Sequence, residues 1–365
     1  MTISAPILKC LAFWCVLWAA TLGMIAPAVA HNAPFSALAM RVSETGVDAD
    51  FQASTKDFAH DLPGIAPWQL LQPAVLTNQK AALAAIVDSR LALMVNGKKI
   101  PAVLGGIEPV PERNDVRLHM RFAWAQTPPA FHVQGVLFPY APRHKTFVNI
   151  YQDGSLKRQG IIDEDTPSLE YHLGSQQTIG AVVRQFIFEG IHHIFLGPDH
   201  ILFIVGLLFL GGTLKQLLKI VTAFTIAHSI TLALATLNIV NPPARIIEPA
   251  IALSIVFVGV HSLTYKGKSD PRLLFAFCFG FIHGFGFANA LREMDLPRFA
   301  LGWSLFSFNV GVEIGQMCIV LTIAPLLALI RRRSEVVSRR VVFGGSLFVI
   351  VAGAFWFVQR AFFTS

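Results

Sequence analysis

From Gly180 onward the chain is almost continuously apolar, and this feature limits what it can fold into. The apolar region divides into segments of about 20 residues or more, the length that an α-helix needs to cross the hydrocarbon core of a bilayer. Backbone groups in lipid must find their hydrogen-bond partners within the segment, so such segments fold as helices. We therefore predict an all-α polytopic membrane bundle of about six transmembrane helices, at roughly 180–210, 215–238, 244–265, 271–291, 299–330 and 340–360.

The composition agrees with a membrane protein that also has a soluble part. Of 365 residues, 54% are hydrophobic and only 14% are charged, and the mean hydropathy is +0.57. These values exclude a disordered or ordinary soluble chain. The net charge of +7 comes largely from basic clusters beside the apolar segments, and no basic groove with interleaved aromatic residues is present. We expect the bilayer, and not a nucleic acid, as a partner.

Residues 1–30 resemble a secretory signal peptide. Lys9 precedes an apolar core from Leu11 to Ile25, and Ala28-Val29-Ala30 is a small-residue cleavage site. An uncleaved first span is the alternative. The signal interpretation places the region that follows outside the cytoplasm.

Residues 31–175 hold most of the charge and read as a small extracytoplasmic β-sandwich-like domain. Asn96-Gly97 predicts a hairpin, because both turn positions tolerate positive φ, and a helix is expected over Gln79–Asp88. The histidines of this region are scattered and predict no metal site. Short alternating runs predict strands at Phe35–Val42, Val47–Gln52, Arg90–Val95, Val116–Ala125, Phe131–Phe138 and Thr146–Tyr151.

The basic residues predict how residues 176–365, the expected six-helix domain, are oriented. Loops on the cytoplasmic side carry an excess of Lys and Arg. If residues 31–175 are exported, three basic loops all lie inside, which predicts a bacterial inner membrane protein with a periplasmic N-terminal domain. These loops contain Lys215 and Lys219; Lys266, Lys268 and Arg272; and Arg331, Arg332, Arg333, Arg339 and Arg340.

The segment Glu189–His200 concentrates side chains that are costly inside a membrane. Ionisable groups in a span normally face the bundle interior and mark an ion or substrate path. Gly197-Pro198 interrupts the segment and predicts a kink. A straight helix would hold His193 and His200 about 10 Å apart along its axis, and a break could shorten that distance. Glu189, His192 and Asp199 complete the cluster in sequence.

The second to fifth predicted spans also contain polar side chains that packing does not need. Asn309, Glu313 and Gln316 recur at helical spacing on one face. The other spans contribute His228, Glu248, His261 and His283. Asn309 and Gln316 could equally be interhelical hydrogen-bonding groups, and Glu248 could be a structural group at the membrane interface.

Imidazole and carboxylate together suit borderline divalent metals such as Ni, Co and Zn. A carboxylate beside a histidine can ligate the metal or fix the tautomer of the ring, and the sequence leaves both roles open. The residues expected to bind metal are His193, Asp199, His200, His228 and His283. Those expected to support them or line a path are Glu189, His192, Glu248, His261, Asn309, Glu313 and Gln316.

Three motifs resemble the HupE/UreJ family of hydrogenase and urease accessory membrane proteins. They are His193-x5-Asp199-His200, Phe281-Ile-His283-Gly-Phe-Gly-Phe-Ala, and Asn309-Val-Gly-Val-Glu313-Ile-Gly-Gln316. The resemblance covers roughly residues 180–330 and is to the branch with an N-terminal extracytoplasmic domain. It implies a secondary permease for nickel or cobalt, in which His193, Asp199, His200 and His283 handle the metal. The chain departs from the pattern at Ile282 and Phe285, where other members read Phe-His-Gly-Tyr or similar.

Three functions remain in competition. The first is import of a transition metal without ATP, since the chain has no phosphate-binding loop. The second is an intramembrane zinc hydrolase with Glu313 or Glu189 as general base and Ser229 beside His228, although a His-Glu-x-x-His pair is missing. The third is metal sensing or assembly, in which residues 31–175 bind a periplasmic partner.

Overall fold

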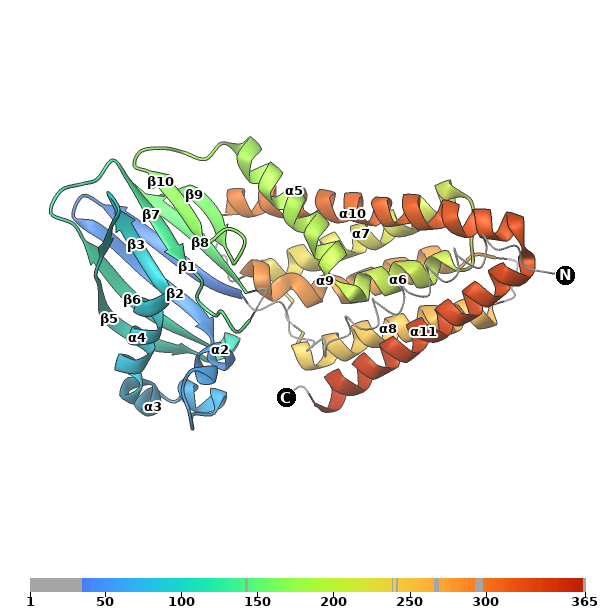
Figure 1. The fold of residues 1–365 in the computed structure, drawn as a ribbon, viewed down its shortest axis with the longest axis horizontal. Helices are drawn as coiled ribbons and strands as arrows, with labels where there is room; N and C mark the ends of the chain where they lie inside the picture. The colour runs from blue at the N-terminus through green and yellow to red at the C-terminus, as the bar shows by residue number, and fades with distance from the viewer. Residues whose placement is uncertain are drawn as a thin grey trace, which may run out of the picture. The chain divides into compact units, whose positions relative to one another are not determined.

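The computed structural model describes residues 35–141, 144–237, 239–240, 242–265, 269–292 and 298–363. The expected signal peptide, residues 1–30, lies outside the described residues, as do Lys266 and Lys268. Helices and strands carry the labels of Figure 1.

The N-terminal region is β-rich, as predicted, and its described strands form two sheets. One sheet has six strands in the order β5-β6-β2-β1-β8-β9, and the other has four in the order β10-β7-β3-β4. β1 pairs in parallel with β8, and the remaining pairs are antiparallel. The strands are β1 Phe35–Ser43, β2 Gly46–Ser54, β3 Leu91–Val95, β4 Lys98–Ile100, β5 Ala102–Val110, β6 Asp115–Ala123, β7 Ala130–Gly135, β8 Lys145–Gln152, β9 Ser155–Ile162 and β10 Ser168–His172.

Alternation of buried and exposed side chains builds the core between the sheets. In β1, Leu38, Met40 and Val42 are buried while their neighbours are not. They join one hydrophobic cluster that includes Leu93 and Val133 of the smaller sheet. Because side chains of a strand alternate between its two faces, each strand supplies one apolar face to this core.

The predicted hairpin is confirmed. Asn96 and Gly97 have φ values of 49° and 75°, and Val95 pairs with Lys98 across the turn. The helix expected at Gln79–Asp88 is α4, Lys80–Arg90. The short helices α2 (Thr55–His60) and α3 (Pro73–Asn78) were not predicted, because six residues are too few to establish a helical period.

The second half of the chain is helical. Its helices are α5 Ile179–Leu196, α6 Pro198–Leu208, α7 Leu214–Thr236, α8 Ala244–Thr264, α9 Arg272–Arg292, α10 Arg298–Arg333 and α11 Glu335–Phe362. Five stretches are long and apolar enough to cross a membrane, namely Ile179–Leu196, Leu214–Thr236, Ala244–Thr264, Leu301–Arg333 and Glu335–Phe362. Pro198–Leu208 and Arg272–Gly286 are shorter apolar helices. The chain is thus a multi-pass membrane protein in which the first predicted span is divided at Gly197.

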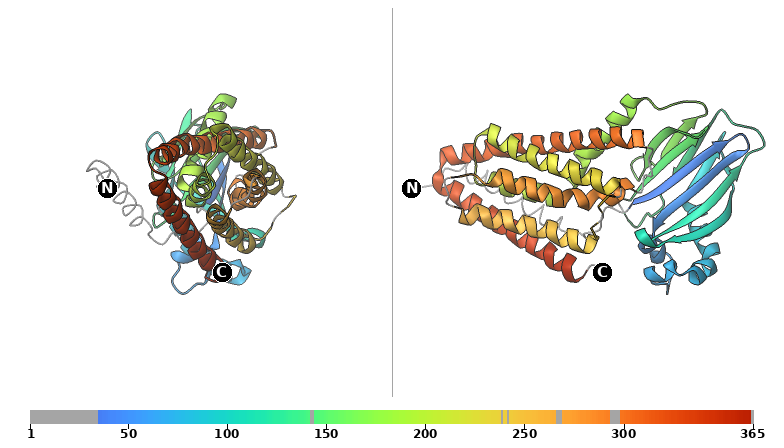
Figure 2. Two further views of the ribbon diagram at one scale, coloured as in Figure 1. Left: turned by 90° about the vertical axis from the view of Figure 1, so that its right-hand side faces the viewer. Right: turned by 180° about the vertical axis from the view of Figure 1, so that it is seen from behind.

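Helices that are distant in the sequence pack as pairs. The most extensive contacts join α7 to α9, α5 to α10 and α8 to α11, and the last pair lies side by side in both views of Figure 2. Two glycines permit the closest approaches. A Cβ at Gly284 of α9 would lie 2.6 Å from the carbonyl oxygen of His228, and one at Gly190 of α5 would lie 2.8 Å from the amide nitrogen of Val312. Small residues therefore bring these backbones together, as in other membrane bundles.

Candidate metal centre between the helices

The break after α5 brings together two histidines that a straight helix would keep apart. Gly197 is extended (φ −87°, ψ 96°), and Pro198 begins α6. Proline lacks an N–H and its ring clashes with the preceding turn, so α5 does not continue through it. The ring centroids of His193 and His200 lie 4.6 Å apart, compared with about 10 Å along a straight helix axis.

A third histidine joins them from another helix. One ring nitrogen each of His193, His200 and His228 lies within 4.8 Å of the other two. Among the described residues, this is the one group of three or more histidine, cysteine and acidic side chains with such spacing. His283 of α9 stands beside it, with its ring centroid 5.2 Å from that of His200. The structure therefore brings together four of the five residues expected to bind metal.

The hydrogen bonds of His228 define its tautomer. Asn309 Nδ2 donates to the carbonyl of Leu305 at 2.8 Å, so Asn309 Oδ1 is the atom that faces the ring. His228 Nδ1 therefore carries the proton and donates to Oδ1 over 3.3 Å. Its Nε2 is buried and has no hydrogen-bond partner among the described residues. That nitrogen has a free lone pair and can coordinate a metal.

Ser254 defines the tautomer of His283 in the same way. The Ser254 hydroxyl donates its single proton to the carbonyl of Ile251 at 2.6 Å. It must therefore accept from His283 Nε2, which lies 2.9 Å away. His283 Nδ1 is then the nitrogen with the lone pair, and within the described part of the chain it is buried without a partner. A histidine that donates its other ring proton is the usual arrangement in metal sites.

His200 occupies the middle of the cluster, at the first turn of α6. Neither of its ring nitrogens has a hydrogen-bond partner among the residues that the structure describes, and the residue is 8% exposed. A Cβ at position 197 would lie 2.7 Å from His200 Nδ1, so glycine is needed there to admit the ring. A buried polar atom without a partner is costly, and a metal ion would satisfy these nitrogens.

Asp199 is the expected ligand that the structure does not bring to the cluster. Its carboxylate accepts two hydrogen bonds from Arg360, at 2.8 and 3.0 Å, and the two residues form an ion pair. Arg360 lies at the end of α11 and also donates to the carbonyl of Glu248 at 3.4 Å. Glu248 therefore contacts Arg360 through its backbone carbonyl group.

Two other residues of the central motif are not part of the histidine group. Glu189 pairs with Lys145 of β8 at 2.5 Å, and His192 is exposed. His261, in the last turn of α8, stacks on Phe257 and lies against Tyr265 and Phe275. None of these three residues has a ring contact or hydrogen bond with the four histidines among the interactions that the structure describes.

The polar side chains of α10 form a strip that continues from His228. Asn309 contacts His228, and one turn further Glu313 accepts hydrogen bonds of 2.5 Å from Thr222 and from Thr225 of α7. Gln316 is fully buried, with its Oε1 3.2 Å from the Thr225 hydroxyl. Among the described residues Glu313 forms no ion pair, and two hydroxyl groups hold its carboxylate.

Sequence reasoning missed two residues that organise this region. Ser254 is 29 positions before His283, and no local spacing connects them. Arg360 ends the last predicted span and is not among the expected site residues, although an arginine within an apolar helix is itself a signal of a buried charge partner. Both contacts join helices that are distant in the sequence.

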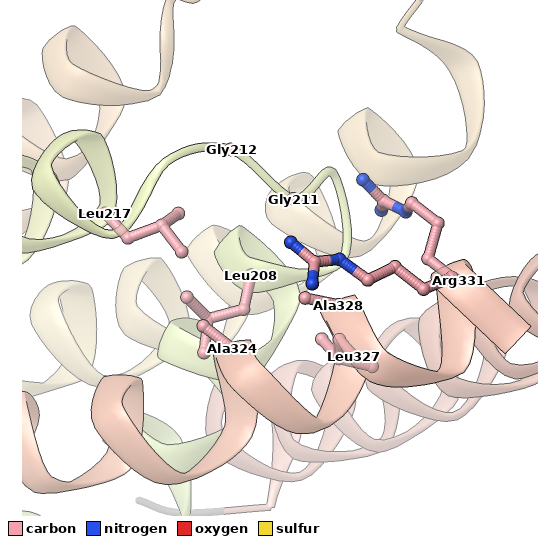
Figure 3. Close-up of a pocket in the computed structure, with 9 residues that line it drawn as sticks. Leu208, Gly211, Gly212, Leu217, Ala324, Leu327, Ala328 and Arg331 are labelled. Carbon is pink, nitrogen blue, oxygen red and sulfur yellow. The ribbon is translucent and has the colours of Figure 1, made fainter.

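The cavity shown in Figure 3 is separate from this centre. It has a volume of about 200 Å³ and lies where the connection between α6 and α7 meets α10. The guanidinium of Arg331 lies over Gly211 there (Figure 3). None of the expected site residues lines it; the lining residues are Leu208, Gly211, Gly212, Leu217, Ala324, Leu327, Ala328, Arg331 and Arg332.

Comparison with known proteins gives one result. Residues 170–360 match the model of a protein family described as HupE / UreJ protein. The match covers more than half of the chain and includes α5 to α10 and α11 as far as residue 360. A comparison with curated proteins finds no match.

Proposed function

Because the chain belongs to the HupE/UreJ family, we propose that it is a secondary permease that imports a divalent transition metal, nickel or cobalt foremost, across the bacterial inner membrane. The observation that carries the proposal is the convergence of His193, His200 and His228 from three helices. Imidazole nitrogens suit Ni, Co and Zn better than Mg or Ca. The metal is the substrate in this proposal, not a resident cofactor.

The two defined tautomers support a binding role. His228 Nε2 and His283 Nδ1 present lone pairs toward the interior, because their opposite nitrogens donate to Asn309 and Ser254. Metal ligands must be deprotonated, and neutral imidazoles meet that condition without releasing a proton first. The four rings replace the water that the ion loses on entering the bundle.

The polar strip along α7 and α10 supplies the next step of the proposed path. Glu313 lies one turn from Asn309 and has no cationic partner among the described residues, while Thr222 and Thr225 keep its carboxylate in place. A divalent ion that leaves the histidines meets this carboxylate on its way through the bundle. Import is driven by the membrane potential, which contributes about 2.3 kcal/mol per charge per 100 mV.

The proposal includes an orientation. Residues 31–175 are the extracytoplasmic domain, exported by the signal peptide 1–30, and the basic loops lie in the cytoplasm, in accord with the positive-inside rule. Lys215 lies in the first turn of α7, Arg272 begins α9, and Arg331 lies in the last turn of α10. With alternating spans, these three residues lie on one side of the membrane.

A zinc hydrolase has less support from the geometry. A general base must reach the metal-bound water, directly or through one water. Asp199 is engaged by Arg360, Glu189 by Lys145, and Glu313 by two threonines. No carboxylate of the described residues lies within the 4.8 Å group of the three histidines.

The test is accumulation of Ni, Co and Zn by metal-starved cells that express the intact chain or His200→Ala. Selective accumulation that the variant loses, with equal amounts of both proteins in the membrane, is expected. Ser346→Ala is the matched control, because it removes another buried polar group, one that contacts Ser262 between α8 and α11. Equal metal uptake in cells with the intact chain, His200→Ala and an empty vector would refute the permease.

A further inference from the structure

Arg360 is a cation buried beside a site that is proposed to bind a cation. It is 7% exposed, and it lies in the last turn of α11. Its guanidinium donates to both oxygens of Asp199 and lies 5.7 Å from the centre of the Trp356 ring. These contacts hold the charge in one place. A buried arginine without a counter-charge would repel a divalent ion, so its pairing matters for the neighbouring histidines.

Asp199 connects this arginine to the metal centre. It immediately precedes His200, and both residues belong to the first turn of α6. The Gly197-Pro198 break separates that turn from α5. The carboxylate that pairs with Arg360 therefore belongs to the same helical turn as a histidine of the cluster.

We propose that Arg360 is a tethered counter-cation that competes with the transported metal ion for the carboxylate of Asp199. When the ion binds at His200, Asp199 leaves Arg360 and contributes to holding the ion. When Arg360 recovers Asp199, the ion loses a negative charge and is released from the histidines. Arg360 is thus a positioning residue that keeps the affinity low enough for turnover. This inference rests on the proposed permease function.

A purely structural role of the ion pair predicts something different. If Arg360 only ties α11 to α6, its removal disorders the first turn of α6, and metal binding weakens. Competition predicts the opposite sign, because an unpaired carboxylate beside the histidines attracts the metal more strongly. The direction of the change in affinity therefore separates the two roles.

The experiment measures Ni²⁺ binding by calorimetry and Ni²⁺ uptake into proteoliposomes with the purified full-length chain. For Arg360→Gln we expect about tenfold tighter binding, equal to about 1.4 kcal/mol, and slower uptake at saturating Ni²⁺. Arg360→Lys retains the charge and should restore most of the turnover. Arg339→Gln is the matched control, since Arg339 lies exposed on the same helix and pairs only with Glu335 among the described residues; it should change neither value.

A second comparison tests the same competition if Arg360→Gln fails to fold because the carboxylate of Asp199 has lost its partner. Asp199→Asn removes the carboxylate that pairs with Arg360, whereas Asp199→Asn with Arg360→Gln removes both charges of that pair. We expect the double variant to bind Ni²⁺ at least about tenfold more tightly than Asp199→Asn alone, because the repelling cation is gone.

Each outcome decides the inference. Unchanged or weaker Ni²⁺ binding by Arg360→Gln would overturn the competition, and so would equal affinity of Asp199→Asn and the double variant. Neither result would contradict the permease function, provided that the wild-type chain transports the metal. A wild-type chain that neither binds nor transports Ni²⁺, Co²⁺ or Zn²⁺ overturns the proposed function itself, and the inference with it.

Discussion

Two buried histidines owe their tautomers to residues of other helices. His228 donates to Asn309 of α10, and His283 donates to Ser254 of α8. In each ring the opposite nitrogen is left with a lone pair that no described residue uses. In the proposed permease, an entering metal ion would meet rings that are already in the ligating tautomer. Hydrogen-bond partners of this kind commonly contribute a factor of 10 to 100 to metal affinity.

This arrangement predicts the effect of Ser254→Ala. The variant removes the acceptor that keeps the proton on His283 Nε2, so Ni²⁺ binding should weaken by roughly 10- to 100-fold. Ser254→Thr keeps a hydroxyl group and should retain most of the affinity. Calorimetric titration of the purified chain measures both.

Ser262→Ala is the matched control for that experiment. Ser262 lies on the same helix and also donates to the carbonyl three residues before it, but its second contact is Ser346 of α11. Its replacement should leave the affinity for Ni²⁺ unchanged. If Ser254→Ala and Ser262→Ala bind Ni²⁺ equally well, Ser254 does not orient His283.

In the β-rich region, His144 and Asp57 approach each other without forming an ion pair near neutral pH. His144 Nδ1 lies 3.9 Å from Asp57 Oδ2. Burial lowers the pKa of His144 to about 3. Burial, together with the charges of Asp115 and Asp61, raises the pKa of Asp57 to about 7. Between these two values both side chains are neutral in the folded state, so the contact is not electrostatic.

These two pKa shifts predict opposite effects of pH on stability. Between about pH 4 and 7 the folded state holds a proton on Asp57 that the unfolded state has lost, so the free energy of unfolding falls as pH rises. Between about pH 3 and 6.5 the unfolded state holds a proton on His144 that the folded state lacks, so the free energy rises. From about pH 4 to 6.5 the two contributions cancel.

Asp57→Asn should remove that cancellation. The free energy of unfolding of the β-rich region should then rise with pH between about pH 4 and 6.5, relative to wild type, by at most about 1.4 kcal/mol per pH unit. Hydrogen exchange of the β1 and β8 amides in the full-length chain, corrected for intrinsic exchange, measures it. If the free energy of unfolding differs between variant and wild type by the same amount across this pH range, the pKa of Asp57 is not raised to about 7.

Among the elements, the pair α5–α6 does most to build the centre. α5 supplies His193, α6 supplies His200, and the extended Gly197 between them sets the angle at which the two rings meet. The Gly-Pro sequence predicted the break, because proline ends a helix locally. It did not reveal that Gly197 must also lack a Cβ to admit the ring of His200.

Gly197→Ala tests this second requirement. Its Cβ would lie 2.7 Å from His200 Nδ1 and 2.8 Å from the carbonyl oxygen of His193, so the ring has to move. We expect a loss of Ni²⁺ binding of at least about tenfold, equal to about 1.4 kcal/mol. The helix content by circular dichroism should remain that of wild type.

Gly302→Ala provides the comparison. A Cβ at Gly302 of α10 meets no atom within 4 Å, and alanine is the better helix former by about 1 kcal/mol. This variant should bind Ni²⁺ as wild type does. Retention of wild-type affinity by Gly197→Ala as well would show that the ring of His200 does not need its present position.

For the whole molecule, the distribution of basic residues predicts which face of the membrane each loop occupies. Ser155, the first residue of β9, should be extracytoplasmic, and Lys215, in the first turn of α7, should be cytoplasmic. Both positions are exposed. The two predictions can be tested independently of metal binding.

Cysteine labelling measures this orientation. In a chain without its native cysteines, Ser155→Cys should react with a membrane-impermeant maleimide in spheroplasts. Lys215→Cys should react only after the membrane is permeabilised. The reverse pattern would place the β-rich region in the cytoplasm and would contradict import in the direction proposed.

Local patterns in the sequence were enough to predict a membrane bundle, a β-rich region before it, the break at Gly197-Pro198 and the histidines of the candidate site. These properties depend on local periodicity and on the cost of charge in lipid, which a single segment reveals. Three contacts between or along helices could be found only in the folded structure. Asp199 pairs with Arg360, Ser254 orients His283, and His261 packs against Tyr265. Helical spacing places a side chain on a face, but the partner of that face depends on how helices distant in sequence pack.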